Sequence, residues 1–185
     1  MVKQPVSGRV KTRLGRDIGM PAAAWWFRHQ TRSLLRRLRD PRWHIVLAVS
    51  PDRAVGSSVW PASLERWPQG RGDLGARMAR ALSSVRGPVV LIGADIPSIE
   101  TCHIAEAFQT LGRASSVIGP SGDGGYWLVG LRNGARRPPD LFQNVRWSVP
   151  DTLADTLPTL PQPVGFVAEL EDVDTLDDLR RLKAG

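Results

Sequence analysis

The sequence predicts an α/β domain with a doubly wound, mostly parallel sheet and helices on both faces. Uncharged apolar runs of strand length occur at 44–50 and 88–92, and amphipathic helical segments separate them. A run without polar alternation is typical of a strand buried on both faces, as in parallel sheets that helices cover. The alternation of strand and helix favours right-handed crossovers within one sheet.

Length, charge and cysteine content limit the possible functions. The 185 residues suit a single domain over 1–185, and the net charge of +7 favours an anionic partner such as nucleotide phosphates, nucleic acid or an acidic membrane surface. The single cysteine, Cys102, excludes an internal disulfide. We see no signal-peptide pattern and no apolar run long enough to cross a bilayer, so we expect a cytoplasmic protein without a membrane span.

A basic loop opens the chain before any apolar periodicity begins. Its glycine and its cations are Lys3, Gly8, Arg9, Lys11 and Arg13. Backbone N–H groups and cationic side chains of such a loop can bind phosphates, and a solvated basic terminus is the alternative. In nucleotide-binding α/β units the phosphate loop follows the first strand, yet only Met1 and Val2 are available here to supply one. We therefore expect most of the first strand to lie upstream of Met1.

Further helices and strands follow in order. The clearest helix is 22–40, with an apolar face and a stripe of arginines that is typical of a solvated helix face, nucleic-acid contact being the alternative; the stripe is Arg28, Arg32, Arg36 and Arg39. Segment 51–72 is too rich in Pro, Gly and Trp to assign. We expect Asp73 to cap a helix that leads into the run at 88–92, and Ser98 to cap a helix that Gly112 ends.

A lone carboxylate follows the second apolar run. Asp95 would lie at the carboxyl end of a central strand, where open α/β sheets bind ligands. Pro97 disfavours helical geometry at the residue before it and so would hold the carboxylate on a short turn. An aspartate that only stabilises the turn is the alternative.

A short antiparallel element is expected near 115–131, where two strand-like segments flank the turn at 121–125. Gly124 and Gly125 would let a ligand lie against the turn with Asp123 facing it, and a tight hairpin that the aspartate stabilises is the alternative. Alternation along the second strand predicts that Tyr126 and Trp127 point to opposite faces, either stacking on a base or sugar ring or filling the core.

The C-terminal third predicts an amphipathic element at 141–147, a short helix near 151–157, a strand at 164–167 and a last helix. Thr175 and Asp178 form an approximate capping box for that helix. Asp172 and Asp174 lie on the same side of the extended segment before it. They could reach a metal, but a capping role is favoured.

Five segments resemble a known family when taken in this order: KQPVSGRVKTRL, LIGADIPS, GPSGDGGYWLVGL, LFQNVRWS and LEDVDTLDDL. They resemble the glycosyltransferase-A-like transferases associated with radical-SAM and selenium-domain gene clusters, which are similar to the guanylyltransferase that activates phospholactate. The resemblance covers nearly the whole chain. It implies a Rossmann-like sheet of the nucleotide-diphospho-sugar transferase (GT-A-like) type that binds a nucleotide or nucleotide sugar with a divalent cation, Mg²⁺ or Mn²⁺.

The resemblance also implies a set of site residues. The metal-binding carboxylate is Asp95. The phosphate-facing loop is Gly8, Arg9, Lys11, Thr12 and Arg13. The acceptor-side loop is Asp123, Gly124, Gly125 and Tyr126. One departure is Val149, because the family usually has a threonine there and its hydroxyl is absent from this chain.

These assignments predict a metal-dependent transferase with a nucleotide-diphospho-sugar or related nucleotide donor and a small-molecule acceptor. A cation held by Asp95 and the basic loop would stabilise the charged leaving group, and Asp123 would act as a second ligand or as a base. Attack by a hydroxyl on a sugar carbon gives glycosyl transfer. Attack by a phosphate on a nucleoside triphosphate gives nucleotidyl transfer, and a non-catalytic nucleotide- or nucleic-acid-binding protein is the remaining alternative.

Overall fold

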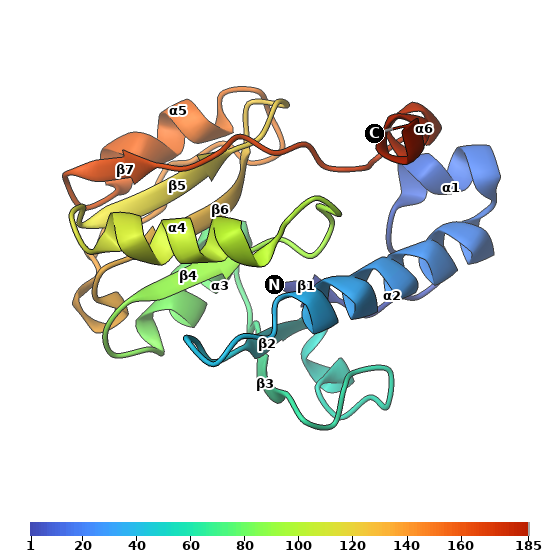
Figure 1. The fold of residues 1–185 in the computed structure, drawn as a ribbon, viewed down its shortest axis with the longest axis horizontal. Coiled ribbons are helices and arrows are strands. Elements are labelled where there is room, and N and C mark those ends of the chain that lie inside the picture. The colour runs from blue at the N-terminus through green and yellow to red at the C-terminus, as the bar shows by residue number, and fades with distance from the viewer. Residues whose placement is uncertain (185) are drawn as a thin grey trace.

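The computed structural model describes residues 1–184 and shows a mixed α/β fold with a parallel sheet flanked by helices (Figure 1). The strands form two sheets. The first is fully parallel, in the order β1 (Val2–Lys3), β2 (Val46–Ser50) and β3 (Glu65–Pro68). The second has the order β4-β6-β5-β7 and consists of β4 (Val89–Ile92), β5 (Ser116–Pro120), β6 (Tyr126–Leu131) and β7 (Val164–Phe166).

Strand β6 sets the direction of the second sheet. It pairs antiparallel with both β4 and β5, whereas β5 and β7 are parallel. The antiparallel element expected near 115–131 is therefore confirmed. The expectation that the run at 88–92 forms a parallel strand is wrong in its pairing, because its ladder partner β6 is antiparallel. An apolar run reports burial on both faces of a strand and carries no information on the direction of its neighbour.

Within residues 1–184 six α-helices surround the sheets: α1 (Thr12–Ile18), α2 (Met20–Arg37), α3 (Leu74–Ser83), α4 (Thr101–Leu111), α5 (Thr152–Thr156) and α6 (Leu176–Ala184). Single 3-10 turns lie at Asp52–Ala54, Gly134–Arg136 and Leu157–Thr159. Helix α4 covers one face of the second sheet, α3 and α5 lie on the other, and α1, α2 and α6 form a separate lobe (Figure 1). Among the described residues, none of these helices has the length and apolarity needed to cross a membrane.

Helix caps test the local predictions. The Asp73 side chain accepts a hydrogen bond from the backbone N–H of Ala76, so the predicted cap of α3 is confirmed. The predicted cap at Ser98 is wrong, because α4 begins after Glu100, whose backbone N–H donates to His103 Nδ1. The intervening Ile99 is fully buried, so the turn before the helix is anchored by apolar packing.

Two segments differ from their expected structure. The unassigned segment 51–72 contains β3, a strand of sequence Glu-Arg-Trp-Pro that pairs with β2 at the edge of the first sheet. Charged residues and proline are common in edge strands. Because β3 therefore contains no apolar run, its sequence does not indicate a strand. The amphipathic element expected at 141–147 forms turns, with positive φ at Phe142 and Asn144.

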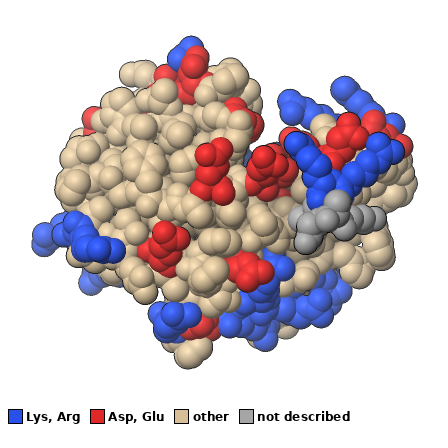
Figure 2. All heavy atoms as spheres, turned by 45° about the horizontal axis from the view of Figure 1, so that its top comes forward, with Lys and Arg blue, Asp and Glu red and all other residues tan. Residues whose placement is uncertain are grey.

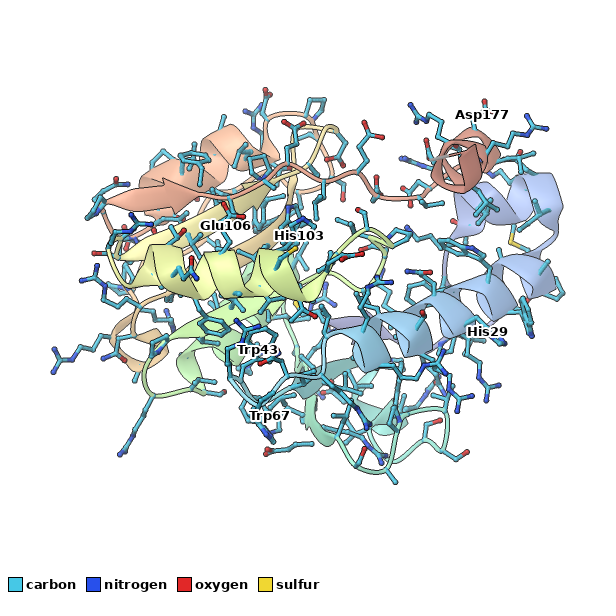
Figure 3. The ribbon with its side chains drawn as sticks, in the orientation of Figure 1. His29, Trp43, Trp67, His103, Glu106 and Asp177 are labelled. Carbon is cyan, nitrogen blue, oxygen red and sulfur yellow. The ribbon has the colours of Figure 1, made fainter. Side chains whose placement is uncertain are left out.

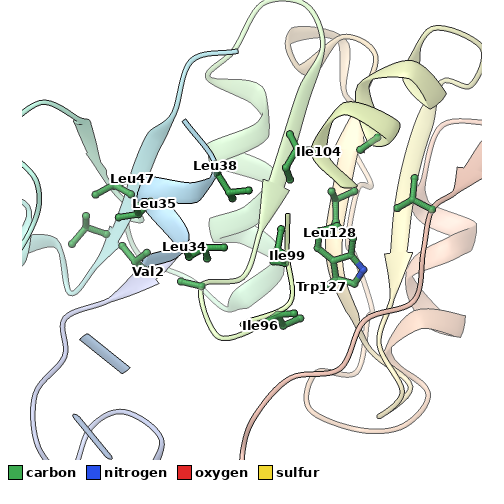
Figure 4. Close-up of a cluster of buried hydrophobic side chains, with 14 of the residues drawn as sticks. Val2, Leu34, Leu35, Leu38, Leu47, Ile96, Ile99, Ile104, Trp127 and Leu128 are labelled. Atoms are coloured by element: carbon green, nitrogen blue, oxygen red, sulfur yellow. The ribbon is translucent and has the colours of Figure 1, made fainter. Parts of the chain in front are cut away.

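The core occupies both faces of the second sheet. Val117 and Leu128 belong to the cluster under α4, which continues across to α2 and the first sheet (Figure 4). Their neighbours Ile118 and Val129 belong to the cluster that packs against α3. Tyr126 and Trp127 likewise join opposite clusters, as their alternation predicts.

A long segment after β7 joins the two parts of the molecule. It runs across the molecule from β7 to α6, which lies against α1 (Figure 1). Val173 and Leu179 pack there on Leu14, in a small cluster of their own. This packing brings residues 172–174 close to the loop before α1, far from them in sequence.

Substitution of Gly124 tests the turn at 121–125. Its φ is +82° and an added Cβ would overlap the Pro150 carbonyl oxygen, so we expect Gly124→Ala to lower the free energy of unfolding by about 2–3 kcal/mol. Gly8→Ala is the matched control, because Gly8 has φ +74° but no atom within 4 Å of an added Cβ, and the cost there is about 1 kcal/mol. Equal losses in urea unfolding would contradict this account.

Candidate active site

A cavity of about 890 Å³ lies beside β1 and the residues that follow β4. Its volume is in the range of small-molecule sites. The residues predicted for the site that line it are Arg9, Lys11, Thr12, Arg13, Asp95, Asp123, Gly125 and Tyr126. Gly8 and Gly124 lie outside this lining. Gly124 is required by its close approach to the Pro150 backbone, and its own carbonyl accepts from the Leu153 N–H.

Lys11 stands at the centre of the charged part of the cavity. Its backbone is left-handed, with φ 46° and ψ 48°, at the residue before α1. Its Nζ donates to Asp174 Oδ1 at 2.6 Å and to Asp95 Oδ2 at 3.4 Å. The Lys11 side chain is only 5% exposed, against 45% for Asp95 and 37% for Asp174. The beginning, the middle and the end of the chain thus meet at one ammonium group.

Burial and neighbouring charges shift the pKa values of Lys11 and Asp172. Burial lowers the pKa of the Lys11 ammonium, but the negative charges of Asp95 and Asp174 outweigh it and hold that pKa above its ordinary value. Burial, followed by the charge of Asp174, raises the pKa of Asp172 to about 6. The exposed Arg13 lies 3.5 Å from Asp174 Oδ2. The site therefore holds three neighbouring carboxylates against one buried cation.

Asp123 lies in the turn between β5 and β6 and lines the cavity. Its Oδ1 accepts from Ser121 Oγ at 2.6 Å and from the Gly125 N–H at 3.0 Å. These bonds match the turn-stabilising role that the sequence left open, and they also fix the carboxylate at the cavity wall. Burial raises the pKa of the Tyr126 phenol, which follows this turn.

Asp172 and Asp174 reach the cavity, and the capping role favoured for them is wrong. The carboxylate that accepts from the backbone N–H groups of Asp174 and Thr175 is that of Asp178. Both earlier aspartates line the cavity instead. The only signal in the sequence was their spacing, which places both on the same side of an extended segment.

A divalent cation fits the donor set of this site. Among residues 1–184 no group of three or more His, Cys, Asp or Glu side chains is placed to hold a metal ion, and Lys11 Nζ contacts both Asp95 and Asp174. Mg²⁺ and Mn²⁺ prefer oxygen ligands, and Mg²⁺ is commonly bound by one or two carboxylates together with substrate phosphates. Asp95 and Asp174 are two carboxylates of this kind, and both line the cavity.

Lys and Arg side chains gather over the lobe of α1, α2 and α6, and Asp and Glu side chains lie on the neighbouring part of the same face (Figure 2). The predicted arginine stripe is exposed: Arg28, Arg32, Arg36 and Arg39. The Lys and Arg side chains attract anions, and the neighbouring carboxylates attract cations. This distribution is compatible with a metal-bound phosphate ligand.

The α/β fold matches that of the nucleotide-diphospho-sugar transferases. Residues 34–149 match the family described as "Uncharacterized protein conserved in bacteria (DUF2064)", and the chain belongs to this family. The crystal structure of a candidate nucleotide-diphospho-sugar transferase from Desulfovibrio desulfuricans G20 is similar, with 31% identity and a TM-score of 0.85 over 98% of this chain and 83% of that one.

More distant structures share the fold. Two crystal structures of Rv0371c from Mycobacterium tuberculosis H37Rv are 18% identical to this chain, with TM-scores of 0.52 and 0.53. They cover 86% and 84% of this chain and 84% of each of those chains, and the second is a complex with manganese. Comparison with curated proteins gives no match.

Removal of the buried cation tests the charge cluster. We expect Lys11→Met to lower the free energy of unfolding by about 2 kcal/mol at pH 7.5, less than for a fully buried pair because its two partners are partly exposed. Arg180→Met is the control, since Arg180 pairs with Asp177 on the exposed surface of α6 and its loss costs about 0.5 kcal/mol or less. Urea unfolding measures both. A loss no larger than that of the control would contradict the central role of Lys11.

The raised pKa of Asp172 predicts a pH-dependent effect. Between the ordinary value of 3.8 and about 6 the unfolded carboxyl loses its proton before the folded one, so this group lowers stability as pH rises through that window. Asparagine does not ionise. We expect Asp172→Asn to raise Tm by about 2–4 °C at pH 7.5 and to change it little at pH 4. Thermal unfolding at the two pH values checks this, and equal shifts would contradict it.

Proposed function

We propose that the chain is a metal-dependent transferase that uses a nucleotide-diphospho-sugar donor. The observation that carries the proposal is the convergence of Asp95 and Asp174 on Lys11 at the wall of a cavity of about 890 Å³. The similarity to a candidate nucleotide-diphospho-sugar transferase supports the class of donor. The manganese complex of a protein with the same fold supports a divalent cation.

In this proposal Asp95 and Asp174 hold the cation, and the donor diphosphate supplies further oxygen ligands. When bound, the cation stabilises the negative charge of the departing nucleoside diphosphate. Arg9 and Arg13, which line the same cavity, bind phosphate oxygens through charge-assisted hydrogen bonds. Lys11 neutralises the two carboxylates when no cation is present and competes with it for the same oxygens.

The acceptor side of the proposal rests on the turn between β5 and β6. Asp123 accepts the proton of the acceptor hydroxyl, and the hydroxyl oxygen forms a bond to the anomeric carbon of the sugar. The bond from that carbon to the diphosphate oxygen breaks, and its electron pair leaves with the nucleoside diphosphate. The hydrogen bonds from Ser121 and Gly125 hold the Asp123 carboxylate in place for this transfer.

A nucleoside triphosphate is a second candidate donor, for nucleotidyl transfer. The observation that favours it is the number of cations along one cavity, where Arg77 joins Lys3 and the other cations of the basic loop. A triphosphate carries more negative charge than a nucleotide sugar and would use these cations more fully. Glycosyl transfer requires binding of a nucleotide sugar, whereas nucleotidyl transfer requires binding of a nucleoside triphosphate. One binding experiment with both kinds of ligand therefore distinguishes the two functions.

A thermal-shift panel tests the proposed function. The chain is heated with individual nucleotide sugars and nucleoside triphosphates, each with and without Mg²⁺ or Mn²⁺. A ligand at about 100 times its Kd should raise Tm by roughly 5–10 °C, because it binds only the folded state. We expect the shift to need the cation and to be lost in Asp95→Ala.

The control for the panel is Asp177→Ala, which removes an exposed carboxylate from α6 and should leave the shift unchanged. A shift only with triphosphates would select nucleotidyl transfer. The proposal fails if the folded protein shows no shift with any member of the panel, or if Asp95→Ala retains the whole cation-dependent shift.

A further inference from the structure

A second cavity, of about 650 Å³, forms a slot between β2 and β4. On both sides of the slot, part of a strand edge has no backbone partner among the described residues. Strand β2 begins at Val46, yet its ladder with β1 covers only Val49 and Ser50. Within the described chain β4 has a single ladder partner, β6, on its other side. Two strand edges therefore face one space, and open edges of this kind pair readily with a further strand.

Both faces of the slot are covered by apolar side chains. Leu38, the residue after α2, Phe108 of α4 and Val85 beyond α3 line it. Trp43, which stacks on Phe108, and Trp67 of β3 are also in its wall (Figure 3). The α3 and α4 helices lie on opposite faces of β4 (Figure 1). A strand in the slot would be buried on both faces, which requires a continuous apolar sequence.

The first residues of the chain already lie at one end of the slot. Val2 pairs with Val49, so Met1 lies opposite Ala48, and residues preceding Met1 would run alongside Leu47 and Val46 in the same register. On the other side the Met1 ammonium donates to the carbonyl oxygen of Ile92 in β4. β1 is thus inserted between β2 and β4 at the point where the slot begins.

We propose that the slot is the seat of a β-strand formed by four or five apolar residues immediately upstream of Met1. Such residues would extend β1, pair with both β2 and β4 and join the two sheets into one. A second fact agrees with this occupant. Burial lowers the pKa of the Met1 ammonium to about 6, and a peptide N–H in its place would donate to Ile92 without a buried charge.

The coding sequence gives the first test. The reading frame upstream of the Met1 codon should continue for at least five codons and encode mostly Val, Ile, Leu or Ala. An in-frame stop codon within those five positions, or a run of polar codons, would overturn the proposal.

The second test extends the 185-residue chain by five residues. One variant carries alternating Val and Ile before Met1, and a matched variant carries alternating Ser and Gly. We expect the apolar extension to raise Tm by roughly 5–10 °C and to slow amide hydrogen exchange in 46–48 and 89–91 at least about tenfold, while the polar extension changes neither.

Two results of the second test would overturn the proposal. The first is equal exchange rates and Tm for the two extensions. The second is protection that appears only in a dimer by sedimentation, because the slot would then take a strand from another copy. The test does not involve nucleotide binding, so its outcome is independent of the proposed function.

Discussion

The ion pairs of Lys11 hold the functional part of this molecule together. A buried ammonium is stable only when anions neutralise it, and the two nearest ones come from Asp95 and Asp174. The loop before α1, the turn after β4 and the segment before α6 must therefore converge at one point. The apolar packing of Leu14 with Val173 and Leu179 maintains this convergence away from the charges.

The division of the sheet explains where the cavity forms. The parallel sheet of β1 to β3 carries α2 and the basic loop, while β4 to β7 carry the acidic turns. A cluster that includes Leu34, Trp127 and Leu128 bridges the two sheets, so each part positions its charged residues against the other (Figure 4). The cations and the carboxylates of the site thus come from different parts of one fold.

Sequence reasoning works here wherever a local pattern has a single physical cause. The apolar runs located β2 and β4, Asp73 marked the start of α3, and the glycine turn located the antiparallel pair. Sequence reasoning failed where contacts between residues far apart in the chain determine the structure. The edge strand β3 has no apolar run, and β4 pairs with residues that lie 36 to 42 positions further along the chain.

The candidate site shows the same division. Asp95 follows an apolar strand and could be predicted from its position. The contact of Asp174 with Lys11 spans 163 residues, and the two-residue spacing of Asp172 and Asp174 indicated only that both lie on the same side of an extended segment. Asp178, four residues later, forms with Thr175 the capping box that the sequence predicts. The local pattern located that cap but could not show that the Asp174 carboxylate contacts Lys11 instead of sharing in it.

The long connection from β7 to α6 also affects how the protein is made. Synthesis proceeds from the N-terminus, so the basic loop leaves the ribosome long before Asp174, which follows Lys11 by 163 residues. A nascent chain has the cationic part of the site without the carboxylate that completes it. Termination between residues 167 and 173 therefore yields a product that contains every strand of both sheets and lacks one of the two anions that neutralise Lys11.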